Sequence, residues 1–175
     1  MRRPSLIVLA VISALALGAA GCSRPHTEVR TLPTGPLNQD EYEHAFNVSA
    51  AGLAPRYGVG KELPRDAPAA QQAERVRALQ RLLRVWAGRI AGLQPPAPAR
   101  RAQERYVAGV RGFAGDLDRA RTLLAGGDIK GANRLLESGR VVSARTRADL
   151  VAARRAFHAL GYDLTDLDSA PVKTS

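Results

Sequence analysis

The residue with the most distinctive chemistry in this chain is Cys22, its only cysteine. A thiol can act as a nucleophile, bind a metal, form a disulfide or be covalently modified. Because no second cysteine exists in the chain, Cys22 has no partner for an intramolecular disulfide. It must therefore be modified, pair between chains, or remain a reactive thiol. The small residues Ala19, Ala20 and Gly21 directly precede it, and they leave the backbone accessible to a peptidase.

The segment before Cys22 has the layout of a secretory signal peptide. Arg2 and Arg3 supply positive charge, and residues 6–20 form an uncharged, mostly aliphatic run. As a helix this run would span roughly 22 Å, which is less than the ~30 Å hydrocarbon core of a bilayer. We therefore expect residues 1–21 to be a signal peptide, with cleavage after Gly21, and not a transmembrane helix.

Residues 17–22, Leu-Gly-Ala-Ala-Gly-Cys, resemble the lipobox of bacterial lipoproteins. The match departs from the usual form in one respect, since Ala19 stands where leucine is usual and the leucine is Leu17. The resemblance implies that Cys22 carries a diacylglyceryl group, and two or three acyl chains are enough for stable anchoring. It places the protein on the outer face of the bacterial cell membrane or the periplasmic face of an envelope membrane. The alternative is an ordinary secretory signal that ends near a free cysteine.

The other residues that could catalyse or bind metal are scattered. The histidines do not share helical spacing, and Cys22 is committed to the N-terminus, so we predict no metal site and no cofactor. Ser143 and Thr146 have no nearby histidine or glutamate in sequence, and we interpret them as small core residues that bond back to their helix. We therefore predict no catalytic residues and expect that the protein is not an enzyme. The histidines are His26, His44 and His158.

Arginine is the remaining feature with functional potential. Of 26 basic residues 23 are arginine, and residues 68–160 hold eighteen basic against seven acidic side chains. A basic face attracts anionic surfaces, so the candidate partners are an anionic envelope polymer or an acidic protein, beside the membrane itself. We expect no nucleic acid, because no aromatic residues interleave the arginines for base stacking. A merely solubilising shell is the alternative. The candidate binding residues are Arg77, Arg81, Arg84, Arg101, Arg105, Arg154 and Arg155.

Four segments show the apolar periodicity of helices. Spacings of three and four residues alternate over residues 69–93, 98–124 and 129–160, and a shorter pattern covers residues 39–54. The glycines at 109, 112 and 115 lower helix propensity but would allow close helix approach.

The connections at residues 94–98 and 126–127 are short, so successive long helices must be antiparallel neighbours. The sequence predicts an all-α fold, an up-and-down bundle of three long helices plus the shorter N-terminal helix. The expected organisation is a signal peptide at 1–21, a lipidated cysteine and flexible tether at 22–36, a bundle domain at 37–161, and an acidic, partly disordered tail at 162–175.

Residues 68–161 carry paired prolines, a Gly-Gly-Asp turn and a closing Leu-Gly-Tyr, and in this they resemble small helical lipoproteins of unknown function from GC-rich bacteria. The resemblance implies only a fold and a cellular location. We expect a non-enzymatic binding or scaffold module that contacts an anionic envelope partner. The alternative is a receptor or sensor for a small apolar ligand, with a cavity among Trp86, Tyr106, Phe113 and Phe157.

Overall fold

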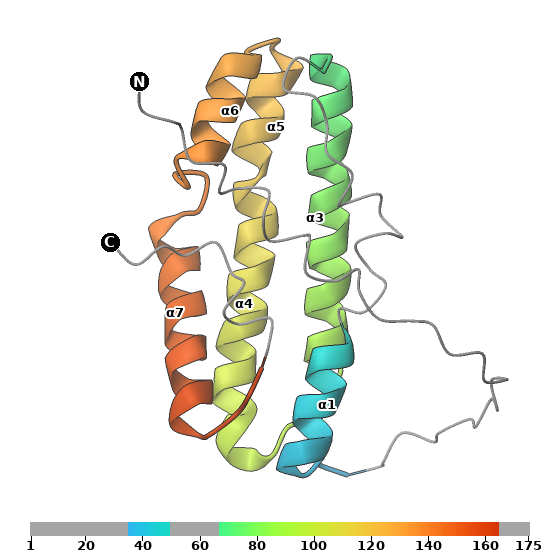
Figure 1. Ribbon diagram of the computed structural model, residues 1–175, viewed down its shortest axis with the longest axis vertical. Coiled ribbons are helices and arrows are strands. Elements are labelled where there is room, and N and C mark those ends of the chain that lie inside the picture. Colours follow the sequence, from blue (N-terminus) through green and yellow to red (C-terminus); the bar gives the residue numbers. More distant parts are fainter. Residues whose placement is uncertain (1–34, 50–66, 165–175) are drawn as a thin grey trace, which may run out of the picture.

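The computed structural model describes residues 35–49 and 67–164, and every regular element within those ranges is helical (Figure 1). The predicted all-α class is confirmed. Residues 1–34, which include the predicted signal peptide and Cys22, and residues 165–175 lie outside the described residues, as does the predicted continuation of the first helix over 50–54. The elements are α1 (Gln39–Ser49), α3 (Ala69–Ala91), the 3-10 turn η2 (Ala97–Ala99), α4 (Arg100–Asp116), α5 (Asp118–Ala125), α6 (Ile129–Glu137) and α7 (Ala144–Ala159).

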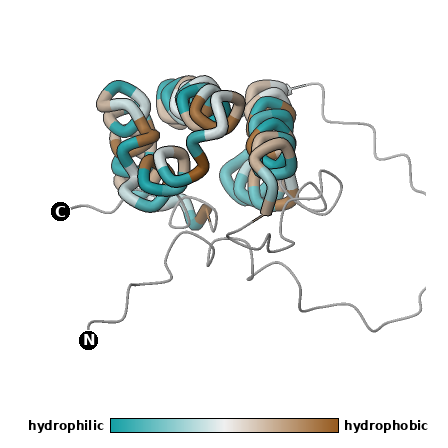
Figure 2. Tube along the Cα trace, turned by 90° about the horizontal axis from the view of Figure 1, so that it is seen from above, coloured by the Kyte–Doolittle hydropathy of each residue, from teal (hydrophilic) through white to brown (hydrophobic). Residues whose placement is uncertain are grey.

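The long helices form three columns that lie side by side. The first column is α3, the second is α4 continued by α5, and the third is α6 followed by α7, with successive columns running in opposite directions (Figure 1). The α4–α5 column lies in the middle, because α4 packs against both α3 and α7 and α5 packs against both α3 and α6. Seen end-on, the columns are largely hydrophilic on their outer surfaces (Figure 2). Helix α1 packs against α3 at one end of the molecule.

Helix α1 begins at the predicted residue because two reciprocal hydrogen bonds cap its N-terminus. The Asn38 side chain accepts a hydrogen bond from the Glu41 amide at 2.9 Å, and Glu41 in turn accepts one from the Asn38 amide at 3.0 Å. This reciprocal pair satisfies two amides that the helix itself leaves without partners. The cap sets the helix so that Tyr42 and Phe46, one turn apart, are both completely buried.

The predicted helix over residues 98–124 is interrupted once, at Leu117. The buried Gln80 side chain of α3 donates to the Ala114 carbonyl at 2.8 Å and to an Asp118 carboxylate oxygen at 3.1 Å. An undisturbed helix would use the Ala114 carbonyl to accept from residue 118, so insertion of a side-chain donor there accounts for the break. Leu117 keeps helical dihedral angles, and α5 therefore continues the column with its apolar face in register.

The predicted single helix over 129–160 is wrong, because the chain leaves the helix at residues 138–143. Gly139 has φ of +67°, a left-handed conformation that ends a helix, and Ser143 caps α7 by accepting from the Thr146 amide at 3.2 Å. The turn buries Val141 and Val142 in the core. Apolar periodicity continued through this turn, which is why the sequence pattern alone did not reveal it.

A carboxylate that the sequence did not single out holds this turn in place. Asp116, the last residue of α4, accepts a hydrogen bond from the Ser143 amide at 2.8 Å. That bond joins two elements 27 residues apart in sequence at the start of α7. Ser143 is consequently a helix cap, and not the mid-helix core residue that the sequence suggested.

Two glycines bring α4 and α7 close together, as the sequence predicted. A Cβ atom on Gly109 would lie 2.7 Å from the Leu150 side chain and 3.2 Å from the Leu150 backbone nitrogen. A Cβ atom on Gly112 would lie 2.5 Å from the Thr146 hydroxyl oxygen. Gly115, in contrast, faces open space. The prediction therefore holds for Gly109 and Gly112 and is wrong for Gly115.

The core extends past residue 161, where the sequence placed the end of the bundle. Gly161, with φ of +77°, reverses the chain after α7, and Tyr162 and Leu164 then pack into the core. The Asn47 side chain of α1 donates to the Asp163 carbonyl at 3.1 Å. Leu160, which the periodicity assigned to the buried face, is instead 37% exposed because the reversal turns it outward.

Candidate functional site

Three of the four aromatic residues that suggested a ligand cavity, Trp86, Tyr106 and Phe157, lie in a packed cluster at the α1 end of the bundle. The fourth, Phe113, is partly buried against the core and takes part in none of the ring contacts among the described residues. Phe46 places its ring centroid 5.2 Å from that of Tyr106 and 5.9 Å from that of Phe157. Trp86 meets the Tyr106 ring edge-on at 5.9 Å. Phe46, which the sequence reasoning did not include, thus fills the space between Tyr106 and Phe157. The cluster consists of Tyr42, Phe46, Trp86, Tyr106, Phe157 and Tyr162.

Tyr42, one of the three tyrosines in this cluster, stays neutral. Burial raises the pKa of the Tyr42 hydroxyl far above its usual value, and the neighbouring Tyr162 raises it further. The Tyr42 ring is stacked on Phe157 and meets Tyr162 edge-on. An uncharged, ring-lined interior is what a hydrophobic core requires, and we assign the cluster to the core.

The predicted arginines of α3 are largely engaged with carboxylates. Glu74 accepts from Arg77 at 3.1 Å and from Arg81 at 3.0 Å, and these bonds lower the pKa of Glu74. Arg84 is one of several groups that lower the pKa of Asp118, after the hydrogen bonds from Gln80 and Arg121. Exposed ion pairs of this kind contribute little stability. They do, however, reduce the positive charge that α3 offers to a partner.

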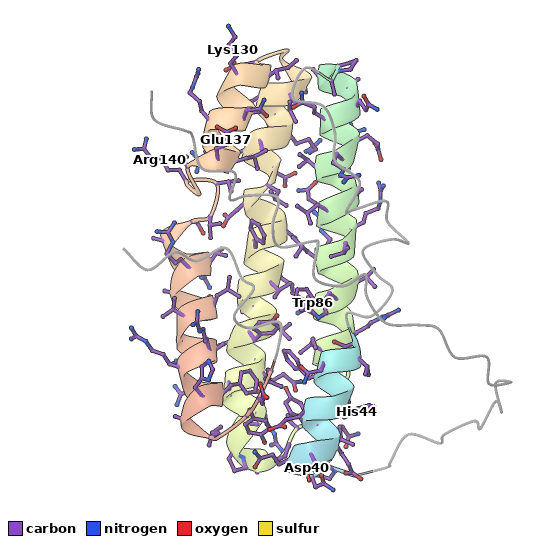
Figure 3. All side chains as sticks on the ribbon, in the orientation of Figure 1. Asp40, His44, Trp86, Lys130, Glu137 and Arg140 are labelled. Atoms are coloured by element: carbon purple, nitrogen blue, oxygen red, sulfur yellow. The ribbon has the colours of Figure 1, made fainter. Side chains whose placement is uncertain are left out.

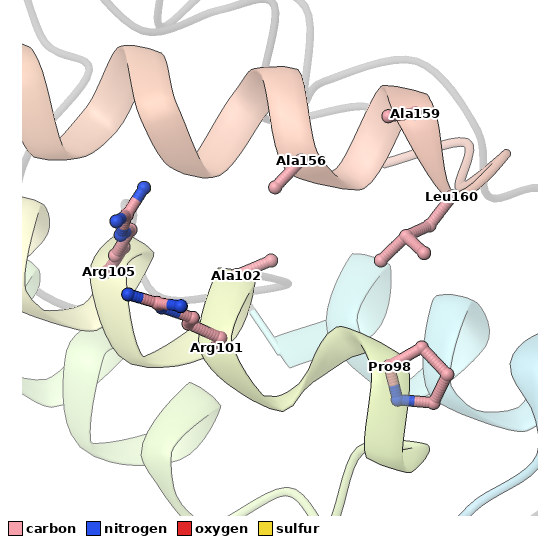
Figure 4. A pocket seen from close by; sticks show the side chains of 7 residues that line it. All are labelled: Pro98, Arg101, Ala102, Arg105, Ala156, Ala159 and Leu160. Carbon is pink, nitrogen blue, oxygen red and sulfur yellow. The ribbon is translucent and has the colours of Figure 1, made fainter.

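A groove between α4 and α7 brings together two of the predicted arginines with an apolar surface. Arg101 and Arg105, one helical turn apart on α4, line it beside the exposed Leu160 at the end of α7 (Figure 4). Its volume is about 310 Å³, at the lower end of the range for small-molecule sites, roughly 300–1,000 Å³. The lining residues are Pro98, Arg101, Ala102, Arg105, Ala156, Ala159 and Leu160.

The two guanidinium groups of the groove have no protein partner in the part of the chain that the structure describes. Neither Arg101 nor Arg105 takes part in any of the ion pairs or side-chain hydrogen bonds there, in contrast to Arg77 and Arg81. Two like charges one turn apart on a helix repel each other, at a cost of about 0.2–0.5 kcal/mol. The groove therefore presents uncompensated positive charge beside apolar surface.

The remaining predicted arginines lie elsewhere. Arg154 and Arg155 are on α7 but do not line the groove, and Arg77, Arg81 and Arg84 belong to α3. Of the seven predicted binding residues, only Arg101 and Arg105 line the groove. The spacing of four residues places Arg101 and Arg105 on one face of a helix, and this could be read from the sequence. The sequence gave no indication that the apolar residues of α7 lie beside them.

The histidines within the described ranges do not form a site. His44 lies on α1 near Asp40 (Figure 3). His158 is exposed near the end of α7. Over residues 35–49 and 67–164, no group of three or more histidine, cysteine, aspartate or glutamate side chains is arranged to hold a metal ion. None of the helices described there is both long and apolar enough to cross a bilayer.

Comparison with known proteins gives no match. No protein-family model, no curated protein and no solved structure is significantly similar to this chain. Any assignment of function therefore depends on the residues and geometry described above.

Proposed function

We propose that the protein is a lipid-anchored extracytoplasmic binding module, without enzymatic activity, that contacts an anionic envelope partner through Arg101 and Arg105. The observation that carries the proposal is the groove between α4 and α7, where two guanidinium groups lack carboxylate partners among the described residues. Guanidinium groups form strong charge-assisted hydrogen bonds with carboxylate and phosphate groups. An anionic partner would supply the acceptors that the described residues do not.

The proposed anchor supplies the location. With Cys22 acylated, the tether up to residue 36 would hold the bundle roughly 20 Å from the membrane surface if it behaves as a flexible coil. At that distance the groove would face lipid headgroups, envelope polymers or other envelope proteins. The bundle has its own core within residues 37–164, so the anchor and the folded part are expected to be separable.

We expect Cys22→Ala to release a folded protein from the membrane. Without the thiol no acyl chain can be attached, whereas the described residues supply a hydrophobic core of their own. Acyl labelling in cells should mark the wild type and not the variant, and fractionation should move the variant from the membrane to the soluble fraction. Circular dichroism of the released variant should show a helical protein. Equal labelling of both proteins would rule out lipidation at Cys22.

We also expect Arg101→Ala/Arg105→Ala to lose a partner that the wild type retains. A photoreactive residue in place of the exposed Ala159, at the groove, should crosslink the partner in intact cells. The matched control is Arg77→Ala/Arg81→Ala, which removes the same charge from α3, where Glu74 already pairs with both arginines.

Partner capture should fall about tenfold or more in the groove variant, since each charge-assisted hydrogen bond contributes about 1.5–3 kcal/mol. Capture by the wild type should also persist at about 0.3 M salt, where exposed charges are strongly screened. Equal loss in both double variants would show that overall charge, and not the groove, attracts the partner.

A further inference from the structure

The groove between α4 and α7 separates its charge from its apolar surface. Arg105 and Arg101 lie toward one end, Ala102 and Ala156 near the middle, and Pro98 and Leu160 at the other end (Figure 4). The seven helical steps from Pro98, in η2, to Arg105, in α4, correspond to about 10 Å along the axis of α4. A site for an extended acidic polymer would instead need positive charge along its whole length.

The apolar end of the groove is itself unusual for a solvent-facing surface. Leu160 is one of two large hydrophobic residues that are exposed in the described part of the chain, and it lies in this groove. The other lining residues at that end are Pro98 and Ala159, neither of which offers a side-chain hydrogen bond. The aliphatic stems of Arg101 and Arg105 can extend this apolar surface toward the charged end.

We propose that this groove binds a single-chain anionic amphiphile, a medium-length fatty-acid carboxylate, with the carboxylate at Arg101 and Arg105 and the acyl chain against Ala156, Ala159 and Leu160. The inference rests on the proposed function above and names the chemical class of its partner. Charge complementarity fixes the head, because two guanidinium groups one turn apart can each donate to a carboxylate. The apolar lining beyond the two arginines offers a surface for the acyl chain, in a groove of about 310 Å³.

The test is calorimetric titration of the protein without its predicted signal peptide, residues 22–175, with decanoate, below the concentration at which decanoate forms micelles. All proteins carry Cys22→Ser, so that no acyl chain of the protein competes and no detergent is needed. Two further ligands separate the contributions. Acetate has the carboxylate without the long alkyl chain. Decyltrimethylammonium has an alkyl chain of the same length but a positively charged head group.

Two pairs of variants locate the site. Arg101→Ala/Arg105→Ala removes the head contacts, with Arg77→Ala/Arg81→Ala as its charge-matched control. Ala159→Phe fills the apolar end, with Ala148→Phe, an equally exposed alanine on α7 outside the groove, as its control. We expect decanoate affinity to fall about tenfold or more in each groove variant and to change less than about twofold in each control.

The inference would be overturned if acetate or decyltrimethylammonium bound as tightly as decanoate, if groove and control variants behaved alike, or if decanoate gave no binding heat. Titration with polyglutamate then shows whether only the fatty-acid ligand is wrong or whether the groove does not bind anions at all. If polyglutamate binds through Arg101 and Arg105 while decanoate does not, an acidic chain is the partner class and the amphiphile is excluded. If neither binds, the arginine groove has lost its support as an anion site.

Discussion

Replacing Phe46 with alanine is expected to lower the free energy of unfolding by about 3–5 kcal/mol. Phe46 is completely buried and contacts the rings of Tyr42, Tyr106 and Phe157, which belong to α1, α4 and α7. Its removal would leave a cavity at the point where three helices meet. Because small domains are stable by only about 5–15 kcal/mol, this single change would consume a large part of the total.

The control for this variant lies two residues away on the same helix. Val48 is 48% exposed, so Val48→Ala opens no buried cavity and should change stability by less than about 0.5 kcal/mol. Urea unfolding followed by circular dichroism measures both variants. If Phe46→Ala were no less stable than Val48→Ala, α1 would not be packed on the bundle as described.

Gly109→Ala should destabilise the protein, although alanine is a better helix former than glycine. The new Cβ atom would meet the Leu150 backbone nitrogen at 3.2 Å as well as its side chain at 2.7 Å. The side chain can turn aside, but relief from the backbone contact requires α4 and α7 to move apart. Overpacking of this kind costs about 1–3 kcal/mol, which exceeds or cancels the gain in helix propensity of about 1 kcal/mol.

The same substitution six residues later should have the opposite sign. Gly115 is on the same helix, and a Cβ atom there would meet nothing within 4 Å, so Gly115→Ala should stabilise by up to about 1 kcal/mol. Thermal unfolding of the two variants side by side isolates helix packing from helix propensity. An equal shift of both melting temperatures would contradict the close approach of α4 and α7 at Gly109.

The contrast between α3 and α4 shows why a basic composition is a poor guide to a binding site. Both helices present arginines four residues apart, Arg77 and Arg81 on α3 and Arg101 and Arg105 on α4. On α3 a single glutamate pairs with both, whereas on α4 no described carboxylate does so. Pairing with a nearby acid, and not the number of arginines, decides which face offers charge to an anion.

Helix positions followed directly from the sequence where local signals were strong. Alternating spacings of three and four residues placed α3 and the α4–α5 column, and Asn38 marked the start of α1 within the described residues. The break after α6 did not follow from periodicity, since Gly139 and Ser143 continue the spacing of three and four residues through the turn. In the structure these two residues end the helix and cap α7, although their spacing placed them on the buried face of a continuous helix.

The sequence by itself determined the all-helical class, and it predicts a lipid attachment at Cys22, which lies outside the described residues. Only the tertiary structure decided which arginines remain unpaired and which apolar residues they accompany. The reason is geometric. Arg101 and Leu160 are far apart in the chain, and they line one groove only because Gly109 and Gly112 let α4 and α7 pack closely.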